Sequence, residues 1–164
     1  HGIKLRLGVA LAADRMRTAF VRRSRQKVLN PVLETPPLPA CFPPAGLRNR
    51  DVGPVDWAMT LAQWNAFFTA CMETEAWRPL REPKGYVNLF DLNKAFVCPW
   101  TRGTGSGVAL RMNPGSPVTA RLMVSHSWAE DVEELMEALN SHCRKEGVAQ
   151  DIGVWFCLFA QYQP

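Results

Sequence analysis

The chain has 164 residues, of which 47% are hydrophobic, and a formal net charge of +4 at pH 7. This size predicts one domain with appendages, and the longest apolar run, residues 153–160, is too short to cross a bilayer. Five cysteines at wide spacings, without a C-x-x-C pair, argue against a disulfide framework and a structural metal and indicate a reducing, cytoplasmic location. Because the first residue is His rather than Met, we expect a fragment of a longer protein.

Residues 1–29 are strongly basic. They hold eight Lys and Arg against one Asp, a net charge of +7, so the remaining residues sum to −3. Val9, Ala13, Met16 and Phe20 recur at helical spacing. The pattern predicts a basic helix or a disordered arm. Its possible roles are binding to an anionic membrane or nucleic acid, docking in a calmodulin-like groove, or organelle targeting.

A proline-rich linker and a packed helix are predicted next. Residues 30–55 contain seven prolines, which break helices and favour an extended path. Residues 56–73 predict a helix capped by Asp56, because large apolar side chains recur along one face. These side chains are Trp57, Leu61, Trp64, Phe68 and Cys71. Such a face predicts a buried core, and a ligand-stacking aromatic platform is the alternative.

Residues 56–113 as a whole predict a helical and turn-rich segment that packs on the domain that follows. Within it, residues 86–98 predict a short strand or turn and then a short helix that ends before Pro99. The glycine-rich stretch at 101–107 is either a flexible connector or an anion-binding loop of backbone N–H groups. The residues of that possible anion-binding loop are Arg102, Gly103, Gly105 and Gly107.

Residues 114–164 carry the clearest pattern, a strand, a helix and a second strand. Residues 118–124 and 152–160 are apolar, which predicts two strands buried on both faces. The helix between them is predicted to start at a Ser127–Glu130 capping box and to stop at Gly147. One helical crossover implies parallel pairing. The predicted fold class is therefore α/β, a partial parallel sheet of TIR-like or flavodoxin-like type preceded by a helical segment, in a domain that continues beyond this chain.

Ligands of open parallel sheets bind beyond the carboxyl ends of the strands. Here that edge predicts a ligand-binding rim. Its members are Ser125, His126, Ser127, Trp128, Gln161 and Tyr162. His126 has the chemistry of a general base, although a structural histidine at a strand end is the more ordinary interpretation. No residue is assigned as catalytic, and Cys157 is predicted to be an inert thiol in mid-strand, buried like Cys71 and Cys143.

The sequence VSHSWAEDVEELMEAL, followed by VWFCLFAQYQ, resembles a group of uncharacterised proteins of dinoflagellates and other protists, in which a strand ends in SH[SA]W. The resemblance covers about residues 57–164 and implies no established activity. More remotely, a strand with a Ser-containing loop, an acidic helix and a second parallel strand is similar to the opening of a TIR-like domain. That resemblance implies a homotypic interaction module; some such domains cleave NAD with a Glu on a later helix, beyond this chain.

Two hypotheses of function follow. The first is an intracellular α/β signalling module of TIR-like type that binds a protein partner or itself and needs no cofactor. The alternative is a nucleotide- or NAD-hydrolysing enzyme whose catalytic acid lies outside this fragment. The predicted location is the cytoplasm, and organelle targeting through residues 1–29 stays open.

Overall fold

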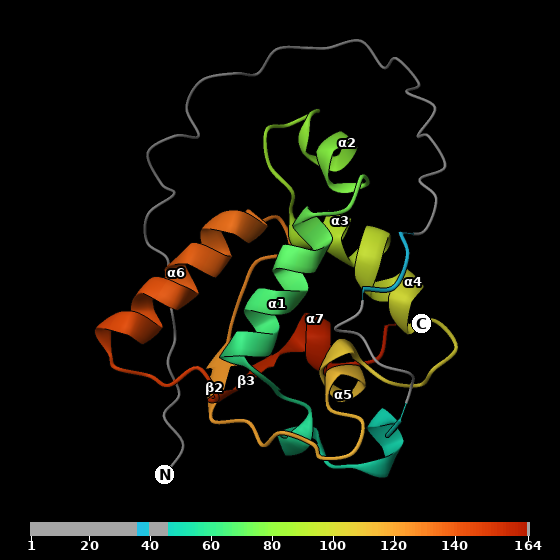
Figure 1. The fold of residues 1–164 in the computed structure, drawn as a ribbon, viewed down its shortest axis with the longest axis vertical. Coiled ribbons are helices and arrows are strands. Elements are labelled where there is room, and N and C mark those ends of the chain that lie inside the picture. The colour runs from blue at the N-terminus through green and yellow to red at the C-terminus, as the bar shows by residue number, and fades with distance from the viewer. Residues whose placement is uncertain (1–35, 40–45, 164) are drawn as a thin grey trace.

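The structure, a computed structural model, describes residues 36–39 and 46–163 (Figure 1). The segment 1–29 and the roles predicted for it therefore lie outside the described residues. In chain order the elements are η1 (Asn49–Asp51), η2 (Pro54–Asp56), β1 (Met59–Thr60), α1 (Leu61–Met72), α2 (Trp77–Arg81), α3 (Leu89–Leu92), η3 (Asn93–Val97), α4 (Cys98–Thr101), α5 (Val108–Met112), β2 (Leu122–Val124), α6 (Val132–Lys145), β3 (Gly153–Phe156) and α7 (Cys157–Ala160). Within the described ranges, no helix combines the length and the apolar character that a membrane crossing requires.

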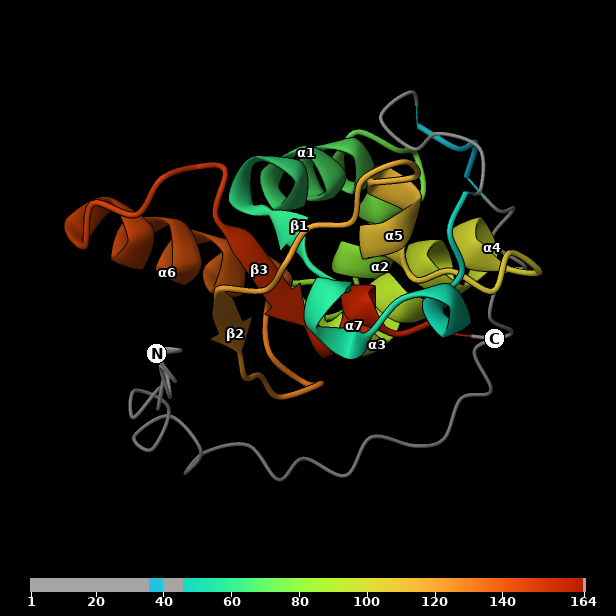
Figure 2. The same ribbon diagram turned by 90° about the horizontal axis from the view of Figure 1, so that it is seen from below.

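The sheet has three strands in the order β1-β3-β2, so β3 lies in the centre (Figure 2). β2 pairs with β3 in parallel, with Leu122 opposite Val154 and Val124 opposite Phe156. Helix α6 connects this parallel pair, which confirms the predicted strand–helix–strand unit and the α/β class. β1 pairs with β3 antiparallel, which makes the sheet mixed.

Strand β2 is shorter and more open than predicted. It has three residues rather than the seven of 118–124, and Val118 makes only isolated bridges to Trp57 and Ala58. Leu122 and Val124 are buried, but Met123 between them is 53% exposed. The prediction that both faces of this strand are covered is therefore wrong.

The second predicted strand, 152–160, is wrong in its second half. β3 ends at Phe156, and the next four residues form the helical turn α7, closed by a 3.1 Å hydrogen bond from the N–H of Gln161 to the carbonyl of Cys157. Phe156 pairs with Val124, where β2 ends, so the ladder with β2 stops there and the backbone that follows closes a helical turn instead. A short, continuously apolar run suits a buried strand and a buried helix equally.

Helix α6 begins at Val132 rather than at Ser127. Asp131 is its N-cap, and Asp131 Oδ1 accepts hydrogen bonds from first-turn N–H groups, that of Glu133 at 2.8 Å. The predicted Ser127–Glu130 capping box is replaced by a turn before the helix, in which the N–H of Ser127 donates to Glu130 Oε2 at 3.2 Å. The helix starts after Asp131 because the Asp131 carboxylate accepts hydrogen bonds from the N–H groups of Glu133 and Glu134, which have no acceptor within the helix.

The predicted end of α6 at Gly147 is confirmed. Gly147 has a φ of 63°, a conformation that side chains other than glycine rarely adopt. The N–H of Gly147 donates to the carbonyl of Arg144, and the N–H of Val148 donates to that of Cys143 at 2.8 Å. This pair of bonds is the Schellman motif, which satisfies the last carbonyls of the helix.

Helix α1 starts at Leu61, five residues later than predicted. Thr60 and Gln63 form its capping box: Thr60 Oγ1 accepts from the N–H of Gln63 at 3.1 Å, and Gln63 Oε1 accepts from the N–H of Thr60 at 2.9 Å. Asp56, the predicted cap, lies in η2 instead. Its carboxylate accepts a hydrogen bond from the Thr119 hydroxyl at 2.8 Å.

The aromatic face of α1 forms the core, as predicted, except that Trp57 lies before β1 and is only partly buried. Its fully buried rings and those they meet are Trp64, Phe67, Phe68, Phe156 and Phe159. The ring centroid of Trp64 lies 4.6 Å from that of Phe156 and 5.2 Å from that of Phe159, both edge to face. Because α1, β3 and α7 meet in these contacts, the segments on either side of residue 114 share one hydrophobic core.

Two segments before residue 114 also differ from expectation. The helix predicted to end before Pro99 continues to Thr101, through the π-helical η3, where the N–H of Cys98 donates to the carbonyl of Asn93. Pro99 falls in the first turn of α4, a position that tolerates proline. Part of the predicted linker packs as well, since the Trp100 indole donates to the carbonyl of Pro36 at 2.8 Å.

Candidate functional site

Strands β2 and β3 end side by side, because Val124 and Phe156 are register partners. Residue 125 and those after it leave β2 at this edge, and Cys157 leaves β3 there. The structure brings together three side chains at the edge: His126 and Trp128 of the predicted rim, and Cys157. We call these three the strand-end cluster.

His126 and Cys157 are in direct contact. His126 Nε2 lies 3.5 Å from Cys157 Sγ, within hydrogen-bonding distance for sulfur, and both side chains are half-buried. The predicted mid-strand position of Cys157 is therefore wrong, because Cys157 begins α7, while its predicted inertness stays a prediction. β3 stops one residue earlier, so the Cys157 side chain no longer follows the strand alternation and meets the residue that follows β2.

The His126 ring is held by aromatic neighbours. Its centroid lies 4.2 Å from that of Phe156 and 5.9 Å from that of Trp128. Burial among these groups lowers the pKa of His126, and the negative charge of Glu130 opposes that effect by raising it. An imidazole whose pKa lies below its usual 6.5 is mainly neutral at pH 7, so one ring nitrogen can accept a proton.

The sulfur of Cys157 is protonated under the same conditions. Burial raises the pKa of the Cys157 thiol, and a hydrogen bond from the backbone of Leu158 partly counteracts this. The pair is therefore a thiol beside a neutral imidazole rather than a thiolate–imidazolium ion pair. In such a pair the imidazole can remove the thiol proton while the sulfur attacks an electrophile.

Phe90 extends this edge toward solvent. Its ring stacks on that of Trp128, with centroids 5.2 Å apart and planes inclined by 30°, and Phe90 is 58% exposed. We call these two residues the aromatic edge. Phe90 was missed in the sequence, where its only signal is an aromatic residue beside Leu89 and Leu92, which occupy the buried side of α3.

Backbone hydrogen bonds hold α3 against the loop that carries Trp128. The N–H of Val132 donates to the carbonyl of Val87 at 2.9 Å, and Asn88 forms an isolated antiparallel bridge with Asp131. The Asn88 side chain also caps α3 by accepting from the N–H of Asp91 at 3.0 Å. The aromatic edge is thus built from two segments, each fixed by its own backbone bonds.

The two serines of the predicted rim are exposed. The Ser127 hydroxyl accepts a hydrogen bond from the N–H of Ala129 at 3.4 Å, within the turn before α6. Ser125 lies between Val124 and His126 at the end of β2. Their role in ligand binding stays a prediction.

The other two rim residues lie beyond α7, near the glycine-rich loop. The Tyr162 hydroxyl accepts a hydrogen bond from the N–H of Gly103 at 3.0 Å, and Gln161 is exposed. Asn49 ties the same loop to α7: its Oδ1 accepts from the N–H of Gly107 at 2.6 Å, and its Nδ2 donates to the carbonyl of Ala160 at 2.7 Å. The structure thus separates the predicted rim into two groups.

These bonds bear on the anion-binding loop predicted for Arg102, Gly103, Gly105 and Gly107. The N–H groups of Gly103 and Gly107 donate to protein oxygens, and the carbonyl of Gly105 accepts from the N–H of Asn49 at 3.0 Å. Arg102 is exposed. An anion would have to displace these protein acceptors, so anion binding stays a prediction and the loop's present contacts are structural.

No family model, curated protein or solved structure matches this chain. The similarity to the protist group and to TIR-like domains therefore stays a prediction from the residues. Among residues 36–39 and 46–163, no group of three or more His, Cys, Asp or Glu side chains could hold a metal ion.

Proposed function

We propose that this chain is an α/β protein-interaction module of TIR-like type that acts in the cytoplasm and binds a second copy of itself through the aromatic edge. The observation that carries the proposal is the Phe90 ring, 58% exposed and stacked on Trp128. Exposed aromatic rings dominate the energetics of protein interfaces once they are buried by a partner.

The way the edge is built supports this role. The segments that carry the two rings are joined by the backbone hydrogen bond from the N–H of Val132 to the carbonyl of Val87, so little conformational freedom is lost on binding. A stacked pair of rings is also self-complementary, since two copies related by a two-fold axis place the same rings against each other.

Sedimentation of the full chain over a range of micromolar concentrations tests the proposal. We expect reversible dimers, and we expect Phe90→Ser to weaken dimerisation by about tenfold or more, the loss typical of an interface hot spot. Val55→Ser is the matched control, because Val55 is 56% exposed but lies in η2, near the other end of β2. A monomer at every concentration, or equal effects of the two substitutions, would contradict the proposal.

A nucleotide- or NAD-hydrolysing enzyme is the second candidate. It is favoured by the position of the Trp128 indole beside His126, since an indole can stack on a base and an imidazole can move a proton. Incubation with NAD, with nicotinamide release as the readout, distinguishes the two functions. Release that Trp128→Ala abolishes would support the enzyme.

A further inference from the structure

The contact between His126 and Cys157 plays no part in the proposed self-association. A basic ring nitrogen lies 3.5 Å from a sulfur, and neither residue is fully buried. Nucleophilic sites that use cysteine place a base within hydrogen-bonding reach of the sulfur and leave the sulfur accessible. We propose that Cys157 is a nucleophile, activated by His126, that takes an acyl group from an ester or thioester.

The proposed step is an acyl transfer without any change of oxidation state. His126 Nε2 takes the proton of the thiol as Cys157 Sγ forms a bond with the acyl carbon. The bond between that carbon and its oxygen or sulfur leaving group breaks, and the imidazolium returns the proton to the leaving group. Water can later attack the thioester on Cys157 by the same route, with His126 as the base.

The surroundings suit this step. The positive charge that develops on His126 is stabilised by the carboxylate of Glu130, which already acts on the ring electrostatically. The indole of Trp128, whose ring centroid lies 5.9 Å from that of His126, and the exposed Phe90 ring stacked on it provide an apolar surface that begins at His126. We therefore expect acyl donors with an aromatic or aliphatic chain to be preferred over small, charged ones.

The other described cysteines differ in ways that make them controls. Cys71 and Cys143 are completely buried, so a reagent does not reach them in the folded protein. Cys98 is half-buried like Cys157, but its sulfur donates to the side-chain carbonyl of Asn93 at 3.4 Å. A side-chain carbonyl accepts a hydrogen bond but does not act as a base. Cys98 is therefore a control for a cysteine of similar burial whose hydrogen-bond partner cannot remove its proton.

The experiment treats the full chain, with Cys41→Ser to remove the cysteine outside the described residues, with p-nitrophenyl acetate. We expect a burst of p-nitrophenol of one equivalent per chain and an acetyl group on the peptide that contains Cys157, found by mass spectrometry. Cys157→Ser should abolish the burst, and Cys98→Ser should leave it unchanged. Acetylation of Cys98 at the same rate as Cys157, or a burst that survives Cys157→Ser, would overturn the proposal.

The role of His126 has its own readout. General-base catalysis contributes at least about 100-fold, so His126→Gln should slow acetylation of Cys157 by about that factor. In the unsubstituted protein the rate should rise with pH as the imidazole loses its proton, with a midpoint below the ordinary histidine value of 6.5, and then level off. A rate that rises only as the thiol ionises, above pH 9, would overturn the assignment without any need for the variant.

Discussion

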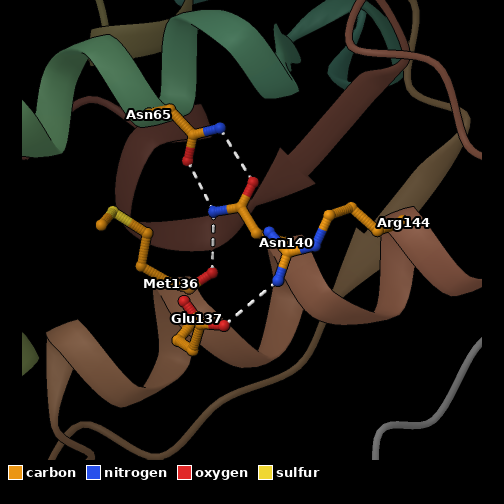
Figure 3. Close-up of polar contacts among 5 residues, drawn as sticks. All are labelled: Asn65, Met136, Glu137, Asn140 and Arg144. Atoms are coloured by element: carbon orange, nitrogen blue, oxygen red, sulfur yellow. Dashed lines mark hydrogen bonds and ion pairs between the residues drawn. The ribbon is translucent and has the colours of Figure 1, made fainter.

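The side-chain amides of Asn65 and Asn140 hydrogen-bond to each other in both directions, at 2.9 and 2.8 Å (Figure 3). Asn65 lies on α1 and Asn140 on α6, so this reciprocal pair joins the two longest helices of the described chain. Asn140 Nδ2 donates in addition to the carbonyl of Met136 at 2.9 Å. Each side-chain amide therefore supplies the other with one hydrogen-bond donor and one acceptor.

Asn65→Ala should therefore lower the free energy of unfolding by about 1 kcal/mol, because the half-buried amide of Asn140 loses the donor and the acceptor that Asn65 supplies and keeps only its bond to Met136. Asn65→Leu combined with Asn140→Leu should cost less than the two single changes together, since neither amide is then left unpaired. Urea unfolding of the unsubstituted chain, the two single leucine variants and the double leucine variant measures this coupling.

Glu137→Gln is the control for that cycle. The Glu137–Arg144 ion pair, at 3.2 Å on the same helix, has both side chains largely exposed, so its loss should change stability by less than about 0.5 kcal/mol (Figure 3). Additive effects of the two asparagine changes would show that the amide pair does not act as a unit.

The start of α6 gives a second prediction. Asp131→Ala should destabilise the protein by about 1 kcal/mol, because Asp131 Oδ1 accepts from the first-turn N–H groups of the helix. Ser127→Ala should cost only a few tenths of a kcal/mol, since Ser127 lies in the turn before the helix and is exposed. Thermal unfolding compares the two variants. A larger effect of Ser127→Ala would contradict the cap at Asp131 and support the Ser127–Glu130 capping box that the sequence predicted.

The glycine-rich loop gives a third. A Cβ on Gly107 would lie 2.6 Å from the carbonyl oxygen of Phe159 and 2.7 Å from that of Ala160, so Gly107→Ala should destabilise by about 1–3 kcal/mol. Gly115→Ala is the control, because nothing lies within 4 Å of its Cβ position. Chemical denaturation is the measurement, and equal stabilities of the two variants would contradict the close approach of the loop to α7.

We expect the strand-end cluster to make the free energy of unfolding depend on pH. The folded-state pKa of His126 lies below the unfolded value of 6.5, so the unfolded chain binds a proton more readily. The contribution of His126 is therefore fully present above pH 6.5 and is lost as the pH falls through the folded-state pKa. His126→Gln should remove this part of the acid sensitivity, which urea unfolding between pH 5 and 8 would show.

The effect of Glu130 on the pKa of His126 can be measured directly. Glu130→Gln removes the negative charge that raises the pKa of His126, so NMR of the imidazole should find that pKa lower still in this variant. An unchanged pKa would mean that the Glu130 carboxylate does not act on the ring.

Local patterns were sufficient for the parts of the fold that depend on neighbours along the chain. The apolar stripe and the stop at Gly147 predicted α6, and the aromatic face of α1 predicted the core. The strand ends were predicted less well, because pairing decides them: β3 stops at Phe156, where its partner β2 ends at Val124. β1 was missed because two residues carry no periodicity.

The same distinction applies to the candidate site. His126 and Trp128 follow a strand with a recognisable pattern, so their place at the sheet edge was predictable. Cys157 and Phe90 were missed, because the position of each depends on contacts between distant segments: the early end of β3 for Cys157, and the docking of α3 on the loop before α6 for Phe90. Such contacts leave no trace in a single sequence.

The position of β3 between β1 and β2 also orders the events of folding. The antiparallel partner of β3, Met59–Thr60, is among the first described elements to leave the ribosome, whereas Gly153–Phe156 is among the last. The sheet cannot close until β3 has been synthesised, and the loop that this pairing closes runs from Leu61 to Ile152, most of the described chain. Until then Trp64 lacks Phe156 and Phe159, two of the rings against which it packs, and a nascent chain with such apolar surface uncovered is prone to aggregate.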